Sequence, residues 1–250
     1  MPESDERQQQ ILDAAVAQIV RQGYDKTTMG DIADEAGVSR GTVYLYFKGK
    51  DELFEALVYR EYLEYARTWL ELVEADPRGG TVGGYYRATL SAVNRRPLIA
   101  ALMRRDPRIV GSYLRQRDNL FAWIQTSPFV LEMLRALQKA GTIRPDVDVG
   151  VAAHIIEMLG YGQLAIAEWK PANQLPPYDI VMETLADMMD RWLTPAGGGK
   201  TKGLAESQAG KAVIRRVIAR AIAQLERAKQ EKAKPKATAR RRGEDNQAEE

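Results

Sequence analysis

Apolar residues recur at helical spacing along most of this chain. The pattern starts with the run from Ile11 to Ile19, in which apolar positions return every three or four residues, and Gly23 ends it. The same spacing continues to Leu193, broken at prolines and glycines, and no convincing alternation of apolar and polar residues interrupts it. We therefore predict an all-α fold. In the later part of the chain the predicted helices cover residues 81–94, 97–105, 108–125, 128–140, 147–169 and 178–193.

The composition is that of a packed protein without cysteine chemistry. Hydrophobic residues make up 45% of the 250 positions, which is enough for a sizeable core. The absence of cysteine excludes disulfides and thiolate metal sites and fits a reducing compartment. The first seven residues are polar and acidic, unlike a signal peptide, and no run of about 18 apolar residues occurs. We expect a cytoplasmic protein without a membrane span.

Catalytic and metal-binding patterns are not apparent in the sequence. His154 is the single histidine, which removes most acid–base and metal arrangements. Glu132, Glu157 and Glu168 lie on predicted helices, with no paired acid or phosphate-binding loop around them. We therefore expect that the chain is not an enzyme and carries no cofactor.

Two short helices joined by a glycine stand near the N-terminus. Thr28 is placed to cap a helix that stops at Gly37, and Ser39 is placed to cap a second one that runs to about Phe47. Gly37 can take the positive φ of a tight turn at little steric cost. A much longer helix begins at Lys50. This order predicts a helix-turn-helix, in which the second short helix enters the major groove of DNA.

The side chains at the start of the second short helix suit DNA contacts. An arginine can bind guanine through two hydrogen bonds and a threonine methyl can pack on thymine, so we predict base contacts for Arg40 and Thr42. Hydroxyl and ammonium groups suit phosphates. The bland alternative is that Ser39 only caps, Arg40 is only solvated and Tyr44 only packs beneath the long helix. The predicted DNA-binding residues are Thr28, Ser39, Arg40, Gly41, Thr42, Tyr44, Lys48 and Lys50.

From Ile11 to Leu57 the chain resembles the tetracycline-repressor (TetR) family. The resemblance implies a homodimer whose N-terminal domain binds a palindromic operator and whose larger helical domain binds an effector. It also implies phosphate contacts for Thr28, Tyr44 and Lys50 and a recognition helix over 39–44. Tyr46 departs from the many relatives that carry histidine there, so it is assigned no base contact. The matching segments are Thr27-Thr28-Met29-Gly30-Asp31-Ile32-Ala33, Ala36-Gly37-Val38-Ser39, Gly41-Thr42-Val43-Tyr44-Leu45-Tyr46-Phe47 and Lys50-Asp51-Glu52-Leu53.

The chain divides into three predicted parts: a DNA-binding domain at 1–50, a helical effector-binding and dimerisation domain at 51–195, and a tail at 196–250. Aromatic residues and methionines in the second part either line an apolar cavity for a hydrophobic effector or form ordinary core. The candidates are Tyr85, Tyr86, Met103, Tyr113, Phe121, Trp123, Met158 and Tyr161. The helices at 147–169 and 178–193 are the expected dimer interface, with small residues at Gly150, Ala152, Ala153, Gly160 and Gly162.

The tail is basic, whereas the rest of the chain is acidic. Residues 196–250 hold 14 Lys and Arg against 7 Asp and Glu, and residues 1–195 hold 22 against 27. After a Gly-rich linker, residues 204–233 form a predicted basic amphipathic helix, and residues 232–250 are predicted to be disordered. The helix could lie on a bilayer or pack against the body or a second subunit. The disordered Lys/Arg run could add weak contacts to DNA. The alternative is a solubilising tail with little further role. The apolar stripe of the helix is Val213, Ile214, Val217, Ile218, Ala221, Ile222 and Leu225.

These observations predict a sequence-specific transcriptional regulator that binds a double-stranded DNA operator. The expected form is a homodimeric repressor that a small hydrophobic effector releases from the operator. The alternative is an accessory protein that binds nucleic acid or a membrane surface through its basic tail.

Overall fold

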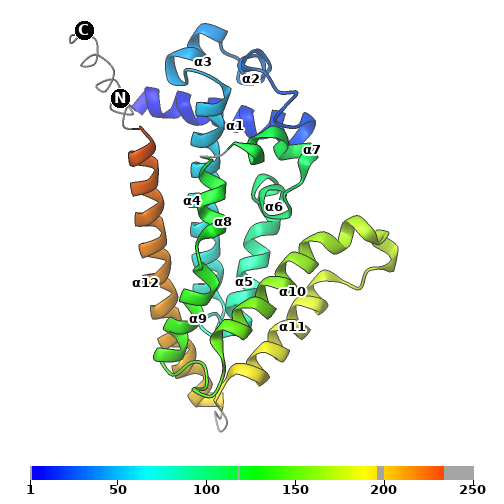
Figure 1. Ribbon diagram of the computed structural model, residues 1–250, viewed down its shortest axis with the longest axis vertical. Coiled ribbons are helices and arrows are strands. Elements are labelled where there is room, and N and C mark those ends of the chain that lie inside the picture. Colours follow the sequence, from blue (N-terminus) through cyan, green and yellow to red (C-terminus); the bar gives the residue numbers. More distant parts are fainter. Residues whose placement is uncertain (1, 117–118, 196–199, 234–250) are drawn as a thin grey trace, which may run out of the picture.

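The chain folds into helices throughout the part that the structure describes. The structure is a computed structural model that describes residues 2–116, 119–195 and 200–233, and no strand occurs in these ranges. The predicted all-α fold is therefore confirmed. Figure 1 shows a small group of N-terminal helices at one end and the larger helical body below it, joined by one long helix.

Three helices and the long helix α4 form the first part of the chain. They are α1 (Pro2–Gln22), α2 (Met29–Glu35), α3 (Arg40–Tyr46) and α4 (Lys50–Ala75). The body adds α5 (Val82–Asn94), α6 (Pro97–Arg104), α7 (Pro107–Val110), the 3-10 helix η1 (Gly111–Arg115), α8 (Leu120–Thr126), α9 (Phe129–Lys139), α10 (Val149–Trp169), the 3-10 helix η2 (Ala172–Gln174), α11 (Tyr178–Leu193) and α12 (Lys200–Ala233).

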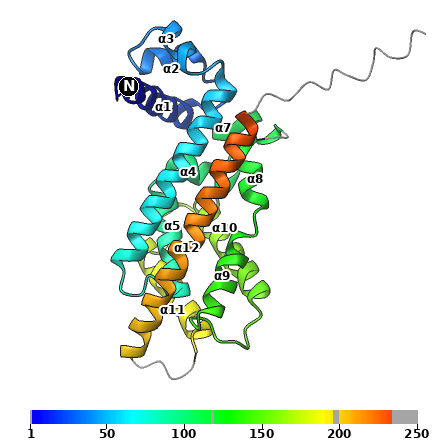
Figure 2. The same ribbon diagram turned by 90° about the vertical axis from the view of Figure 1, so that its left-hand side faces the viewer.

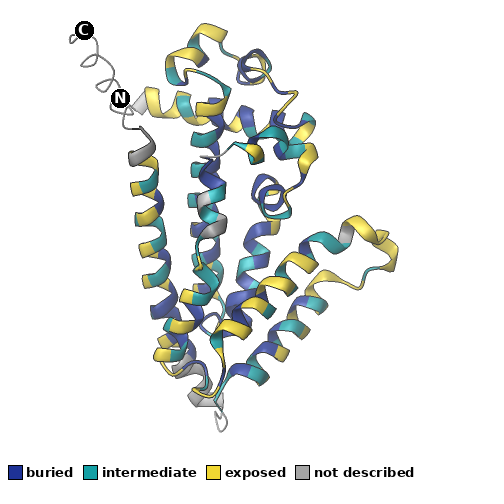
Figure 3. Cartoon of the chain, in the orientation of Figure 1, coloured by how far each residue is buried: buried dark blue, intermediate teal, exposed yellow. Residues whose placement is uncertain are grey.

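Helix α4 belongs to both parts of the molecule. Leu53 and Phe54 near its start are fully buried and pack with α1, whereas Trp69 and Val73 near its end are buried in the body. The buried residues form one continuous cluster from the N-terminal helices to the far end of the body. Figure 3 shows this buried side of α4 facing its neighbours. The core therefore runs along α4 without a break between domains.

The helix predicted over 108–125 is wrong, because the chain there forms α7, η1 and α8 separately. Gly111 has a φ of 48°, which interrupts a right-handed helix. A Cβ at Gly111 would lie 2.3 Å from a carboxylate oxygen of Asp25, so this break lets the segment approach the N-terminal domain. Asn119 then caps α8 by accepting a hydrogen bond of 2.6 Å from the amide of Ala122.

Helix α12 packs against the body along α4 and α9. Its first turns dock on the loop after α4, where the hydroxyl of Ser207 donates to the carbonyl of Pro77 (2.7 Å) and accepts from the amide of Gly80 (3.1 Å). Near its other end, the Lys229 ammonium lies 3.9 Å from the centre of the Tyr59 ring. Figure 2 shows α12 running beside α4 toward the N-terminal helices. Residues 196–199 and 234–250, with the predicted linker and disordered end, lie outside the described residues.

Helices α5 and α11 cross closely enough that glycine is required at the crossing. A Cβ on Gly83 would lie 2.2 Å from the carbonyl oxygen of Ala186. The Asp190 carboxylate reinforces the crossing by accepting from the Gly83 amide (2.8 Å) and the Thr81 hydroxyl (3.0 Å). Burial raises the pKa of this carboxyl above its usual range.

We expect Gly83→Ala to lower the free energy of unfolding by about 1–3 kcal/mol, because the new methyl group must push α5 and α11 apart. Urea denaturation followed by circular dichroism measures this. The control is Gly162→Ala on α10, where a Cβ meets nothing within 4 Å and alanine favours the helix. Equal stability of the Gly83→Ala and Gly162→Ala proteins would contradict the close crossing.

Candidate nucleic-acid interface and ligand cavity

The turn between α2 and α3 is built by Gly37 and the residues around it. Gly37 has a φ of 64°, and the Val38 amide donates to the Ala33 carbonyl (3.0 Å), which closes the turn. Ile32 and Val43, one from each helix, are both fully buried beneath it. The crossing of the two helices is thus set by local backbone geometry and by apolar contacts between them.

Both short helices have side-chain caps at their N-termini. Thr28 and Asp31 form a capping box, in which the Thr28 hydroxyl accepts from the Asp31 amide (3.1 Å) and the Asp31 carboxylate accepts from the Thr28 amide (2.8 Å). Ser39 caps α3 by accepting from the Thr42 amide (3.0 Å), and the two hydroxyls of Ser39 and Thr42 lie 2.8 Å apart. These three predicted DNA-contact residues therefore also hold the helix starts in place.

Arg40 begins α3 and is exposed. Its guanidinium lies over Gly30 in α2, because a Cβ on Gly30 would come within 2.5 Å of an Arg40 nitrogen. The pKa of the Asp31 carboxyl is lowered mainly by hydrogen bonds from Thr28, and the charge of Arg40 adds to this. Arg40 thus sits on the outer side of the two helices with its charge near the start of α2.

The exposed face of α3 carries two large side chains. Tyr44 is 53% exposed and Leu45 is 85% exposed. The sequence prediction included Tyr44 but missed Leu45, because a leucine in an amphipathic pattern is ordinarily assigned to the core. A leucine this exposed on a short helix beside Arg40 and Tyr44 is suited to contact a partner surface.

Two lysines lie where the chain passes from α3 to α4, with Lys48 in the connection and Lys50 as the first residue of α4. The Lys50 ammonium donates to the carbonyl of Tyr24 (3.0 Å) and lies 4.4 Å from the centre of the Tyr24 ring, so it ties the start of α4 to the loop before α2. An ammonium has three donors, which leaves Lys50 with capacity for an anion as well. The Lys48 side chain is exposed, and its backbone amide donates to the Glu52 carboxylate (2.8 Å).

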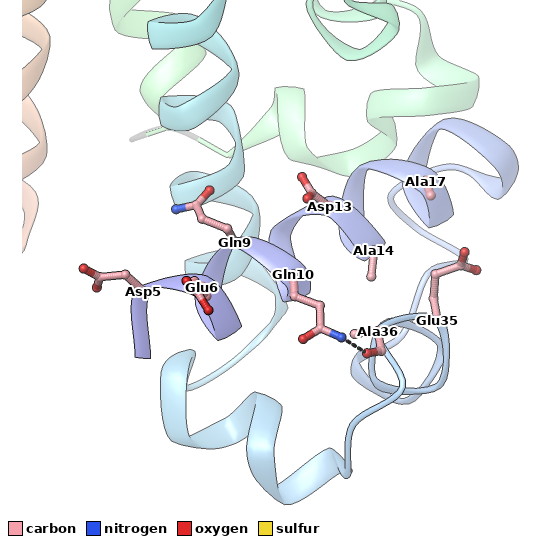
Figure 4. A pocket seen from close by; sticks show the side chains of 9 residues that line it. All are labelled: Asp5, Glu6, Gln9, Gln10, Asp13, Ala14, Ala17, Glu35 and Ala36. Carbon is pink, nitrogen blue, oxygen red and sulfur yellow. Dashed lines mark hydrogen bonds between the residues drawn. The ribbon is translucent and has the colours of Figure 1, made fainter. Parts of the chain in front are cut away.

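A hollow beside α1 has the opposite charge character. Figure 4 shows Asp5, Glu6 and Asp13 from α1, and Glu35 from α2, around this hollow. The Gln10 side chain spans it by donating to the carbonyl of Ala36 (2.7 Å). Asp13 pairs with Arg60 (2.7 Å) and Glu35 with Arg21 (3.3 Å), whereas Asp5 and Glu6 form no ion pair among the described residues. The hollow is therefore less favourable to DNA phosphates than the face that carries Arg40 and the two lysines.

The segment from α7 to η1 fastens the N-terminal domain to the body. The Asp25 carboxylate accepts from the hydroxyl and the amide (3.1 Å) of Ser112, and these hydrogen bonds lower the pKa of Asp25. Tyr113 and Phe54 lie edge to face with their ring centres 4.5 Å apart, and Tyr24 packs on both rings. The loop that precedes α2 is therefore in direct contact with the body.

An apolar cavity lies within the body between α4, α5, α8 and α10. It has a volume of about 200 Å³. Its walls contain five of the eight residues predicted to bind a ligand, and these are Tyr85, Tyr86, Met103, Phe121 and Tyr161. Burial raises the pKa of Tyr86 to about 12, so this phenol is a neutral hydrogen-bond donor at physiological pH.

The other three predicted ligand residues lie elsewhere or are not described. Tyr113 is fully buried at the junction with the N-terminal domain, where its hydroxyl donates to Glu55 (2.9 Å), so it does not line the cavity. Met158 is 54% exposed on α10, because its position points away from the cavity that Tyr161 borders. Trp123 lies in α8, and its side chain is outside the described part of the structure.

Sequence reasoning missed the contribution of α4 to the cavity. Tyr62 and Tyr65 line it from α4, and Phe129 lines it from the start of α9. Both tyrosines of α4 are buried, so their spacing alone does not distinguish them from ordinary core residues. Only the folded arrangement shows that the same side chains border a space.

Comparison with known proteins finds a family match in the N-terminal part of the chain. The family model for bacterial regulatory proteins of the tetR family matches residues 11–57. The uncharacterized regulator YfiR of Bacillus subtilis is 46% identical over 54 residues, which are 22% of this chain and 26% of YfiR. The chain thus matches about a quarter of the length of such relatives. Residues 11–57 therefore match the TetR family.

Longer matches to TetR-family proteins are more distant. The repressor KstR2 of Mycolicibacterium smegmatis is 23% identical over 189 residues, covering 72% of this chain and 87% of KstR2. The crystal structure of FadR from Bacillus subtilis with stearoyl-CoA has a TM-score of 0.55 at 21% identity, covering 74% of this chain and 98% of FadR. At this identity the likeness shows a shared helical fold.

The body of the chain exposes apolar side chains on α10 and α11. Met158 and Tyr161 on α10, and Ile180 and Met188 on α11, are each more than half exposed. The stretch Val149–Ile166 is long and apolar enough to span a membrane, and 22% of it is buried. Among the small residues expected at a dimer contact, Ala152 and Ala153 are instead buried within the subunit, whereas a Cβ on Gly160 or Gly162 would meet nothing within 4 Å.

The Asp25–Ser112 contact has a predictable pH dependence. Because the folded state lowers the pKa of Asp25, this contact stabilises the fold above the unfolded pKa of about 3.9 and is lost as the pH falls through the folded value. We expect Asp25→Asn to lower the melting temperature at pH 6 and to have a smaller effect near pH 3. Differential scanning calorimetry measures both. An exposed α2 carboxylate changed by Asp34→Asn serves as control, and equal Asp25→Asn effects at the two pH values would contradict the assignment.

Proposed function

We propose that this TetR-family chain is a sequence-specific DNA-binding transcriptional regulator. The observation that carries the proposal is the outer face of α3, where Arg40 and Tyr44 are exposed on a helix whose crossing with α2 is held by Gly37. A short helix fixed in this way is the element that enters the major groove in helix-turn-helix proteins. Because bacterial DNA lies in the cytoplasm, we place the regulator there.

Each DNA-facing residue takes a role that follows from its chemistry. Arg40 reads guanine, and Thr42 and Leu45 offer methyl groups to thymine. Thr28, Ser39, Tyr44, Lys48 and Lys50 hold phosphates, and Gly41 lets the backbone of α3 approach the DNA. Lys50 is well suited to this, because its hydrogen bond to the Tyr24 carbonyl (3.0 Å) fixes the ammonium at the start of α4.

The regulator acts as a homodimer on a palindromic operator. Two copies would cover the exposed apolar side chains of α10 and α11, among them Met158 and Met188, in a symmetric four-helix contact. Monomeric soluble proteins rarely leave a surface of this kind uncovered. The two α3 helices would then reach major grooves one helical turn apart.

A small hydrophobic effector controls DNA binding through the cavity. Met103 in α6 and Phe121 in α8 line it, and the segment between these two residues forms the junction with the N-terminal domain. An effector that widens the cavity moves this segment, and the movement reaches the loop before α2 through the Asp25–Ser112 contact. The separation of the two recognition helices then changes and the operator is released.

Repression is the favoured sign of regulation. The matched proteins include KstR2, named a transcriptional repressor, and a probable acrEF/envCD operon repressor of Escherichia coli, 43% identical over 49 residues. The alternative of a membrane-surface protein has less support. The stripe residues Ile214, Ile218 and Leu225 are buried on the body, so that face of α12 is not available to a bilayer.

Removing the Arg40 side chain tests the base contact. We expect Arg40→Ala to cost about 1–3 kcal/mol of binding to an operator selected from random duplexes, with less effect on scrambled DNA. Lys50→Ala should weaken binding to both duplexes alike. It should also lower the slope of the logarithm of the binding constant against the logarithm of the salt concentration by about one. Fluorescence anisotropy measures both, with the exposed α9 residue change Arg135→Ala as control. An unchanged operator preference in Arg40→Ala would remove Arg40 from base readout.

Charge placed on the α10–α11 surface tests the dimer. We expect Met158→Glu together with Met188→Glu to convert a dimer into a monomer, because a desolvated carboxylate without a partner is costly at an interface. Analytical ultracentrifugation at micromolar concentration measures the mass. The control is Ala219→Glu on the exposed side of α12. If the wild-type chain is a monomer, or the double variant stays a dimer, this interface is wrong.

A further inference from the structure

Helix α12 forms one wall of a second apolar chamber beside the cavity. The chamber lies between α4, α8, α9 and α12 and has a volume of about 170 Å³. Helix α12 contributes Ile218, Ala221, Ile222 and Leu225 to it. The predicted apolar stripe of α12 therefore does more than attach the helix to the body.

The second chamber and the cavity share a wall. Tyr62, Tyr65, Met103, Ile124, Ser127 and Phe129 border both spaces. Each space alone is smaller than the roughly 300 Å³ at which drug-sized ligand sites begin, and the two together exceed it. Methionine adapts its shape easily, so a shift of Met103 can join them.

Each space contains a buried hydrogen-bond donor without a partner among the described residues. In the second chamber this is the indole Nε1 of Trp69, a residue only 3% exposed. In the cavity it is the hydroxyl of Tyr86, which is 2% exposed. Because an unsatisfied buried donor is costly, such groups point to a partner that supplies an acceptor.

The charge of the walls narrows the class of ligand. Among the described residues that line the two spaces no lysine or arginine occurs, and the one charged residue is the exposed Glu157 of the cavity. An anionic group would find no counter-ion in either space. The centre of the Trp69 ring lies 6.1 Å from that of Tyr65 and 5.8 Å from that of Phe129. Such a group of rings suits flat or ring-containing molecules.

We propose that α12 completes a two-lobed ligand site that takes an elongated, uncharged, ring-containing molecule. One end of the ligand lies in the chamber walled by α12, where an oxygen of the ligand accepts a hydrogen bond from Trp69 Nε1. The role of this ligand as effector rests on the proposed function, but its binding does not. Helix α12 is attached near its start by the hydrogen bonds of Ser207 to the α4–α5 loop. Near its end the Lys229 ammonium lies over the Tyr59 ring.

A pair of matched α12 variants tests the chamber. The probe is Nile red, which is uncharged, ring-fused and carries a carbonyl oxygen, titrated into the full chain without DNA and followed by fluorescence. We expect saturable binding to the wild type and a loss of at least about tenfold in Ala221→Trp, which fills the chamber. Ala219→Trp, the same change on the exposed side of α12, should bind as the wild type does.

Ala221→Met is the milder variant and should weaken Nile red in the same direction, which keeps the test decisive if the tryptophan unfolds the chain. No saturable binding to the wild type would overturn the site. Equal binding by the wild type and the Ala221 variants would overturn the part played by α12.

The indole donor is tested with two probes. Trp69→Phe keeps a ring and removes the N–H, so we expect roughly tenfold weaker binding of Nile red, the loss of one hydrogen bond to a buried donor. Diphenylhexatriene, an elongated hydrocarbon without an acceptor, should bind the variant and the wild type alike. If Trp69→Phe leaves Nile red unaffected, or weakens both probes equally, the assigned hydrogen bond is wrong.

Operator binding by the same proteins, measured without any probe, separates this inference from the proposed function. We expect Ala219→Trp, with its exposed substitution, to bind DNA as the wild type does. A chain that shows the Nile red pattern but prefers no duplex would refute the regulator and leave the two-lobed site standing. A chain that binds its operator without the Nile red pattern would refute the two-lobed site and leave the regulator standing.

Discussion

The packing of the N-terminal helices and of the body on one continuous helix is the constraint on which the rest of the molecule depends. Leu53 and Phe54 near the start of α4 are buried with the N-terminal helices, and Trp69 near its end is buried in the body. An α-helix transmits displacement along its axis because every turn is held by backbone hydrogen bonds. Because α4 runs unbroken over 26 residues, a displacement beside Trp69 can reach its N-terminal end. The cavity, the junction and the N-terminal helices are thus all in contact with one another through α4.

The junction adds a second connection, and its position decides what kind of movement is possible. Asp25 is held by Ser112, and Tyr24 packs on Phe54 and Tyr113, so the loop before α2 is attached to the body at a point away from the α4 axis. A domain held at one point can swing freely, whereas a domain held at two can only follow the relative shift of its supports. This is why the glycine at 111 matters, since its positive φ brings η1 against Asp25.

Sequence reasoning succeeded where structure is determined locally. The capping residues Thr28 and Ser39 and the glycine at 37 are read within a few positions, and the starts of α2 and α3 followed from them. The fold class followed from the helical spacing of the apolar residues. It failed where a contact between distant segments decides. The break at Gly111 depends on Asp25, and the exposure of Leu45 depends on which side of α3 the body covers. Spacing alone cannot tell a tyrosine that fills the core from one that borders a cavity, which is why Tyr62 and Tyr65 were missed as lining residues while Tyr113 was wrongly expected there.

Helix α12 connects the second chamber to α4. Its residues wall one chamber, while Lys229 and Ser207 attach it to Tyr59 and to the loop that follows α4. A ligand between α12 and Trp69 would therefore contact α4 on one side and α12 on the other. Since the rings of Tyr65 and Trp69 lie stacked with their centres 6.1 Å apart, a shift of either ring changes the packing of α4 itself. The polar groups left without partners in the two spaces are consistent with this, because a core that served packing alone would gain stability by replacing Trp69 with a side chain that has no donor to satisfy.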